Sequence, residues 1–184
     1  MSTSNRPYHH GDLLAALLDA AEALLDEGGD GALSLREVAR RAGVSPAAAY
    51  RHVPDKEALL ARLAARGFTA FGTALRAAAA GMPGAPLDAM GLAYVEFALA
   101  RPARFRLMFG PLAARAKDEG LGEARGAAFA ALSAVAGSRA ASLRAWGLVH
   151  GLAMLLLDGA LPAEDPRALV REVLGLAPGE AGAA

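Results

Sequence analysis

The stretch from Ser34 to Lys56, SLREVARRAGVSPAAAYRHVPDK, constrains the fold more than any other part of the chain. Ser34 is followed three residues later by Glu37, which predicts a capping box at the start of a helix. Gly43 stands where the chain must leave that helix with a positive φ. Ser45 and Pro46 predict the N-cap and first position of a second helix. Two short helices joined by a tight turn form the helix-turn-helix layout, whose second helix enters the DNA major groove.

Local charge favours the same interpretation, because capped helices around a glycine also occur in proteins that bind no DNA. Between Ser34 and Arg66 the chain has seven Lys/Arg and three Asp/Glu, so this segment carries +4 in a chain whose net charge is zero. A phosphate-binding surface needs such a local excess of positive charge rather than a basic protein overall.

The segment AGVSPAAAYRHVPDKEALL resembles the helix-turn-helix signature of the TetR/AcrR family of one-component transcriptional regulators. The resemblance covers roughly residues 10 to 60. The matching residues are Gly43, Val44, Ser45, Tyr50, His52, Lys56, Glu57 and Leu59. One departure is that Pro46 and three alanines occupy the early recognition helix, where the family usually has polar residues or glycine.

The resemblance implies a set of DNA contacts. We expect phosphate contacts from Ser34, Tyr50, His52 and Lys56, helped by helix N-termini. Arg36 and Arg51 are expected to reach bases or nearby phosphates, and Ala47 a thymine methyl. Ser45 and Pro46 complete the expected DNA-binding surface. With so few polar groups on the recognition helix, DNA shape is expected to carry part of the specificity.

Composition limits the other possibilities. The chain has 184 residues, 54% of them hydrophobic and few aromatic, which favours packed helices over β-sheet. It contains no cysteine, so disulfides and thiolate metal sites are excluded, and we expect neither a metal nor a cofactor. The N-terminus has no apolar signal-like run, and no apolar run is long enough to span a bilayer. We therefore expect a cytoplasmic protein with no membrane partner.

The apolar periodicity predicts an all-α fold of about nine helices. We expect residues 1–56 to form an N-terminal arm and a three-helix DNA-binding head, and residues 57–184 to form a helical effector-binding and dimerisation body. A long helix begins near Asp55 and joins the two. In the family that the motif resembles, this helix transmits ligand binding to the head. A helix over about 139–159 has apolar residues all round and is expected to be buried on most sides.

The body has a cluster of large side chains that could line an effector pocket or simply form the core. Taken one residue at a time, the core is the better interpretation, and the family resemblance favours a pocket for the group as a whole. The ligand would be small and largely apolar. The residues are Met90, Tyr94, Phe97, Phe105, Met108, Phe109, Trp146, His150 and Met154. AWGLVHG also resembles a Trp-x-x-x-His-Gly pattern of one TetR subgroup.

A homodimer is expected, because one short recognition helix makes few base contacts and two copies can read a pseudo-palindrome. As in the family, the last two helices would pair with their copies in a four-helix bundle. The expected interface comprises Gly147, Gly151, Leu155, Leu169 and Val173. Packing of the two glycines within the chain is an almost equal alternative.

Catalysis is not expected, since the sequence has no nucleophile elbow, phosphate loop or paired carboxylates. The chain therefore reads as a ligand-responsive transcriptional regulator, most simply a repressor. Two alternatives stay open. One is a helical small-molecule or protein-binding module without specific DNA function, and the other is an architectural DNA binder without an effector.

Overall fold

The computed structural model describes residues 10–176, and every regular element in that part of the chain is helical. The all-α prediction is therefore confirmed. The arm, residues 1–9, lies outside the described residues. The elements are α1 (His10–Gly28), a short 3-10 helix (Asp30–Ala32), α2 (Leu35–Arg41), α3 (Pro46–His52), α4 (Lys56–Gly81), α5 (Pro86–Ala100), α6 (Pro102–Phe109), α7 (Pro111–Arg115), α8 (Glu119–Ala136), α9 (Arg139–Leu157) and α10 (Pro166–Val173).

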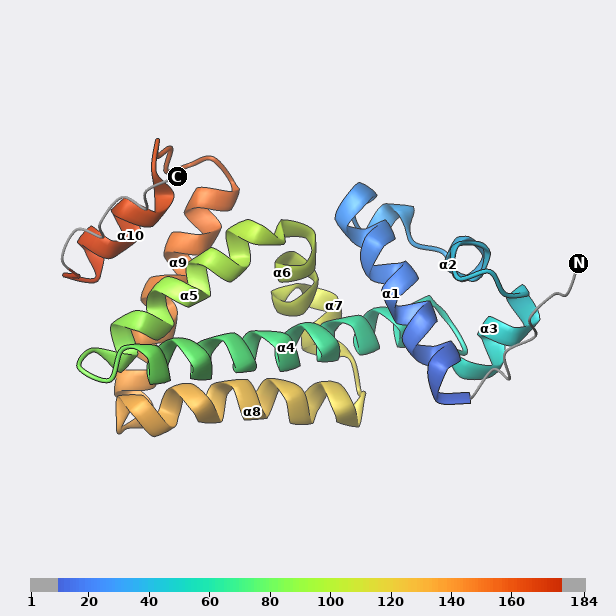
Figure 1. Cartoon of the computed structure of the whole chain (residues 1–184), viewed down its shortest axis with the longest axis horizontal. Coiled ribbons are helices and arrows are strands. Elements are labelled where there is room, and N and C mark those ends of the chain that lie inside the picture. The colour runs from blue at the N-terminus through green and yellow to red at the C-terminus, as the bar shows by residue number, and fades with distance from the viewer. Residues whose placement is uncertain (1–9, 177–184) are drawn as a thin grey trace, which may run out of the picture.

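Helices α1, α2 and α3 form a small head at one end of an elongated molecule (Figure 1). Their buried faces share a core with the first turns of α4, because each helix has an apolar stripe directed to the same point. The most enclosed side chains of this core are Leu17, Leu25, Val38, Val53 and Leu59.

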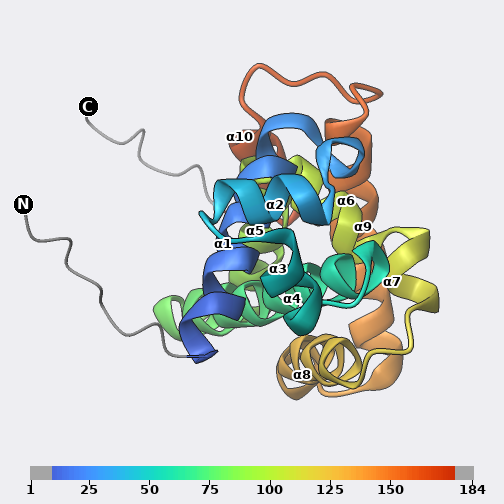
Figure 2. The ribbon, with the colours of Figure 1, turned by 90° about the vertical axis from the view of Figure 1, so that its right-hand side faces the viewer.

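Helix α4 runs from the head along the whole body (Figure 1). Helix α8 lies along α4, and α5 packs on α4 as well, with α9 and α10 beyond α5. The view along the long axis shows α8 at one side of this assembly and α10 at the other (Figure 2). Helix α4 begins at Lys56, the last residue of the expected head. Because α4 is continuous, the head and the body share it.

Helix α8 begins at Glu119, where Asp118 caps it by accepting the Leu121 N–H at 2.8 Å. The structure departs from expectation in α9. Helix α9 is not buried on most sides: its buried residues are Ser142, Val149, Leu152 and Ala153. Helix α9 is also long and apolar enough to cross a membrane by length and composition alone, which is weak evidence because core helices pass the same test.

Candidate functional site

The turn between α2 and α3 has the geometry that its sequence predicts. Gly43 has φ +70°, and the Val44 N–H donates to the Ala39 carbonyl at 2.9 Å, which ends α2. Ser45 then caps α3 by accepting the Ala48 N–H at 3.2 Å. The three caps Ser34, Ser45 and Asp55 each accept a backbone N–H from the helix that follows. The angle between α2 and α3 is thus set by local hydrogen bonds.

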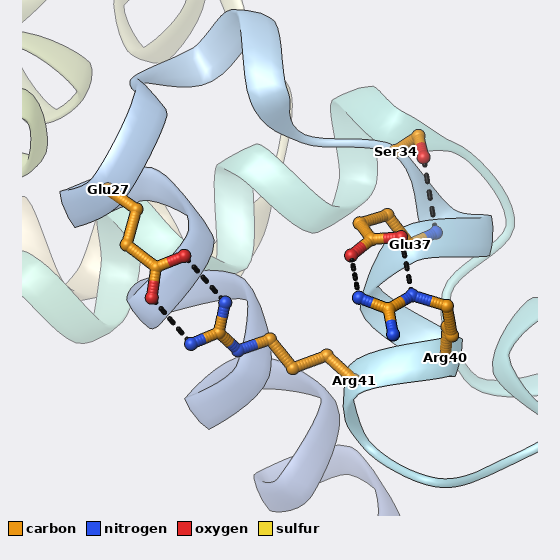
Figure 3. Close-up of polar contacts among 5 residues, drawn as sticks. All are labelled: Glu27, Ser34, Glu37, Arg40 and Arg41. Atoms are coloured by element: carbon orange, nitrogen blue, oxygen red, sulfur yellow. Dashed lines mark hydrogen bonds and ion pairs between the residues drawn. The ribbon is translucent and has the colours of Figure 1, made fainter.

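The predicted capping box at the start of α2 forms only in part. Ser34 accepts the Glu37 N–H at 3.2 Å, as expected. The Glu37 carboxylate binds the Arg40 guanidinium at 2.8 and 2.5 Å, because a two-point bond to a cation is stronger than one to a backbone N–H (Figure 3). Arg41 is likewise paired with Glu27 of α1 at 2.6 and 2.5 Å (Figure 3). Both arginines are therefore engaged within the head.

The side chains expected to contact DNA are mostly exposed. Tyr50 is 48% exposed, a large value for an aromatic side chain in a folded protein. Arg36 and Arg51 form no ion pair with any residue between 10 and 176. His52 is half-buried at the end of α3, where Arg62 of α4 donates to its carbonyl at 2.7 Å. The remaining expected contacts, all exposed, are Ser34, Ser45, Pro46, Ala47 and Lys56.

The body contains a cavity of about 870 Å³ that is open to solvent and is lined by residues of helices α4 to α9. This volume is within the range of small-molecule sites. Six of the nine residues expected in a pocket line it: Met90, Tyr94, Met108, Phe109, Trp146 and His150. Three aromatic side chains that sequence reasoning did not place in the pocket also line it, namely Phe68, Phe71 and Phe129.

The other three expected pocket residues do not line this cavity. Phe105 is fully buried and packs its ring on Phe109 and His150, so it forms the wall behind the lining residues. Phe97 packs edge-on against Phe71. Met154 packs against the core on a part of α9 beyond His150.

A three-residue hydrogen-bond chain fixes the polar groups of the cavity wall. The Trp146 Nε1–H donates to the Tyr94 hydroxyl oxygen at 3.1 Å. The Tyr94 hydroxyl lies 2.8 Å from Nδ1 of His150. Because Tyr94 has one hydroxyl proton, it can donate to Nδ1 of His150 while it accepts from Trp146. Burial lowers the pKa of His150 and raises the pKa of Tyr94, which keeps both groups neutral.

A cluster of charged side chains joins the head to the body. Arg104 of α6 is only 5% exposed, and its guanidinium lies 3.3 Å from Glu22 and 3.2 Å from Asp26 of α1. Arg66 of α4 lies 2.6 Å from Asp19 of the same helix α1. The acidic face of α1 thus faces the body rather than solvent alone. Helix α6 carries both Arg104 and the cavity residues Met108 and Phe109.

The residues expected at a dimer interface are largely uncovered. Leu155 and Val173 are 47% and 42% exposed, and Leu169 is half-buried. A Cβ added at Gly147 or Gly151 would have no atom within 4 Å. The alternative that these glycines allow close packing within the chain is therefore wrong.

Sequence reasoning missed four arginines near the cavity and the head. Arg104 is buried in α6 together with Phe105 and Leu107. Its place among these apolar residues was the only sign in the sequence that it is buried. Arg125, Arg139 and Arg144 line the cavity but lie on faces that look solvated in the sequence. Within residues 10–176 no group of three or more His, Asp or Glu side chains could hold a metal ion.

Two family models match the chain. The model of bacterial regulatory proteins of the tetR family matches residues 17–63, and a model of the tetracyclin repressor-like C-terminal domain matches residues 87–176. No curated protein matches the chain.

Solved structures share the architecture. A Rhodococcus sp. RHA1 protein of unknown function is 34% identical, with a TM-score of 0.77 over 93% of this chain and 96% of that one. A TetR-family regulatory protein from Rhodococcus RHA1 is 21% identical, with a TM-score of 0.64 over 88% and 92%. The SmeT–triclosan complex is 20% identical, with a TM-score of 0.52 over 89% and 90%. The last two show the fold alone.

The Trp-x-x-x-His-Gly subgroup stays a prediction, since neither family model addresses it. The two models cover the head and most of the body, and the motif residues Gly43, Tyr50 and Lys56 lie within the first match. The chain belongs to the TetR family of bacterial regulatory proteins, and it is a transcriptional regulator rather than an enzyme.

Proposed function

We propose that this chain is a cytoplasmic, ligand-responsive repressor that binds a pseudo-palindromic operator as a homodimer. The observation that carries the proposal is the capped helix-turn-helix with Tyr50, Arg51 and Lys56 exposed on it. A solvent-facing tyrosine and unpaired arginines have no role in the core of the head. They suit a surface that grips phosphates.

The chemistry of α3 divides the DNA contacts into two groups. Ser34, Tyr50, His52 and Lys56 would bind phosphates around the recognition helix. Arg36 and Arg51 would reach base edges, and Ala47 a thymine methyl. Because the exposed start of α3 is Pro46 followed by alanines, sequence-dependent DNA shape would supply the rest of the specificity.

The uncovered apolar surface of α9 and α10 supports a homodimer. Leu148 and Leu155 of α9 are 46% and 47% exposed, and the open glycines Gly147 and Gly151 share that side of the helix. A face of this kind is rare on a monomer and would let a second copy approach closely. Pairing α9 and α10 with their copies would bury it and set the spacing of the two heads.

The cavity supports an effector. It has an apolar, largely aromatic wall and one hydrogen-bonded chain, which is the composition of small-molecule sites. The structure of SmeT, which shares the fold, is that of a complex with triclosan. We infer that this chain likewise takes a small, largely apolar effector in the body.

Two helices connect the cavity to the head. Helix α4 lines the cavity with Phe68 and Phe71 and begins beside the recognition helix. Helix α6 lines it with Met108 and Phe109 and holds α1 through Arg104. A ligand that displaces Phe109 would move Arg104 relative to Glu22. Such a ligand changes the affinity of the protein for DNA only if the ligand itself binds the two arrangements of the head with different affinities.

A gel-shift experiment on the DNA upstream of the chain's own gene tests the proposal. A specific regulator should bind that fragment more tightly than a shuffled fragment of equal length and composition by at least about a thousandfold. Equal binding to both fragments would indicate an architectural DNA binder. No binding to either at low salt would leave a small-molecule or protein-binding module and contradict the proposal.

A further inference from the structure

The walls of the body cavity carry an unbalanced positive charge. Three arginines line it, Arg125 of α8 and Arg139 and Arg144 of α9, against a single acid, Asp88 of α5. None of the three arginines forms an ion pair with any residue of the described chain, 10–176. Arg125 donates one hydrogen bond, to the Ala113 carbonyl at 3.3 Å. The cavity therefore has a charge of +2 at neutral pH in a protein whose net charge is zero.

The arginines are the solvent-exposed part of the cavity lining. All three are exposed, whereas the lining residues Phe68, Phe71 and Tyr94 are buried. Arg139 is in the first turn of α9, where the helix dipole disfavours a cation, and that turn has no acidic residue to compensate. An anion placed there would be attracted by the arginines and by the positive end of the helix dipole.

The interior of the cavity has few free polar groups with which a ligand could form hydrogen bonds. The polar groups of Tyr94, Trp146 and His150 bind one another, apart from Nε2 of His150, and the rest of the inner wall is apolar. A ligand that fits both regions has an apolar body and a negatively charged head. The body would lie against Phe71 and Phe109, and the head would face the arginines.

We propose that the effector of this protein is an amphipathic organic anion, an aliphatic or aromatic body that ends in a carboxylate. The inference rests on the proposed function, because it names the chemical class of the ligand for the same cavity. The arginines supply the selectivity, since an apolar cavity alone would favour the neutral analogue over a carboxylate that loses its hydration there.

The test compares ligands that differ only in the head group. Decanoate, decan-1-ol and decylamine are titrated into the full-length protein, followed by fluorescence of Trp146, the chain's single tryptophan. The pair 2-naphthoate and 2-naphthylmethanol is titrated by calorimetry to cover aromatic bodies. At low salt each carboxylate should bind about tenfold more tightly than its neutral partner, and the amine should bind most weakly. Added salt should weaken only the binding of the acids.

Variants assign the selectivity to the arginines. Arg139→Gln and Arg144→Gln should each weaken carboxylate binding about two- to fivefold and leave the binding of decan-1-ol unchanged. Arg101→Gln, at an exposed position between α5 and α6 that does not line the cavity, is the matched control and should change neither.

Three outcomes would overturn the proposal. They are equal binding of acids and neutral analogues, carboxylate binding that is the same in wild type and both variants, and no binding of either acid. Gel shifts on the same preparations separate this failure from failure of the proposed function, since a regulator with a different effector would still bind its upstream DNA.

Discussion

His150 is the titratable side chain on which the polar order of the cavity depends. Its Nδ1 lies 2.8 Å from the Tyr94 hydroxyl oxygen, and protonation of the ring would make both ring nitrogens donors, so that Tyr94 could no longer donate to Nδ1. Burial is the cause of its lowered pKa, and the rings that surround it are Tyr94, Phe105, Phe109 and Trp146. The chain thus carries a histidine that resists protonation where a ligand would bind.

The first prediction concerns pH. Because the pKa of His150 is lower in the folded than in the unfolded state, the unfolded state takes up the proton first as pH falls below about 6.5. Stability should therefore be unaffected by His150 above that pH and should decrease below it. Thermal melts of wild type and His150→Gln, which keeps an acceptor without a titration, should show a smaller fall in Tm from pH 7.5 to 5.5 in the variant. Equal falls would contradict this role.

At the scale of single helices, α6 connects the cavity with the head. Its Arg104 is almost fully enclosed, whereas Arg106, two residues on, pairs with Asp158 at 2.6 Å with both side chains nearly half exposed. The same helix therefore provides a buried and an exposed ion pair of the same residue types. Only the buried pair links the body to α1.

The second prediction follows from this contrast. Arg104→Met removes the closer of the two arginines that pair with the half-buried Glu22, leaving Arg66 at 3.6 Å, and also removes the pair with Asp26. It should lower the free energy of unfolding by about 2 kcal/mol. Arg106→Met, the matched control, should cost less than about 1 kcal/mol because water screens its pair. Urea unfolding at pH 7 measures both. Equal losses would show that the Arg104 cluster contributes no more than a surface pair.

The elements that sequence reasoning placed correctly are those with local signals. Ser34, Gly43, Ser45 and Asp55 act on residues within four positions of themselves, so the caps and the turn followed from the sequence alone. The partner predicted for the Glu37 carboxylate, a backbone N–H at the helix cap, was wrong. That N–H and the Arg40 side chain lie at similar sequence distances from Glu37 and compete for its carboxylate.

The long-range features could not be predicted in the same way. Arg104 meets Asp26 across 78 positions, and nothing in either local sequence names the other. The exposed side of α9 was also missed, because apolar residues around a whole helix indicate burial without telling whether the same chain or another copy supplies the cover. Which aromatic side chains face the cavity and which stand behind it depends on how α4, α5 and α9 pack.

At the scale of the whole molecule, the uncovered side of α9 leads to the third prediction. Leu155→Arg places a charge in the proposed dimer interface and should weaken the homodimer at least about tenfold. Ala70→Arg, at an exposed position on α4, should leave it intact. Sedimentation velocity over a range of concentrations measures both, with circular dichroism to check the fold. A monomeric wild type, or a Leu155→Arg dimer as tight as wild type, would contradict the assignment of this face.

We propose that the head and the body make separable contributions to regulation. The head would bind phosphates through side chains that are mostly exposed around α3, and the cavity would provide a place where a ligand can move α4 and α6. Specific DNA binding by the head is the claim on which the rest depends, since an effector matters to a repressor only if it changes that binding.

Fluorescence anisotropy on the upstream DNA, as a function of salt, measures this claim most directly. Tyr50→Ala should weaken binding to every sequence. Lys56→Ala should do the same and reduce the slope of log affinity against log salt by about one. Arg76→Ala, far along α4, is the control and should match wild type. Unchanged affinity and slope in both head variants would contradict the account.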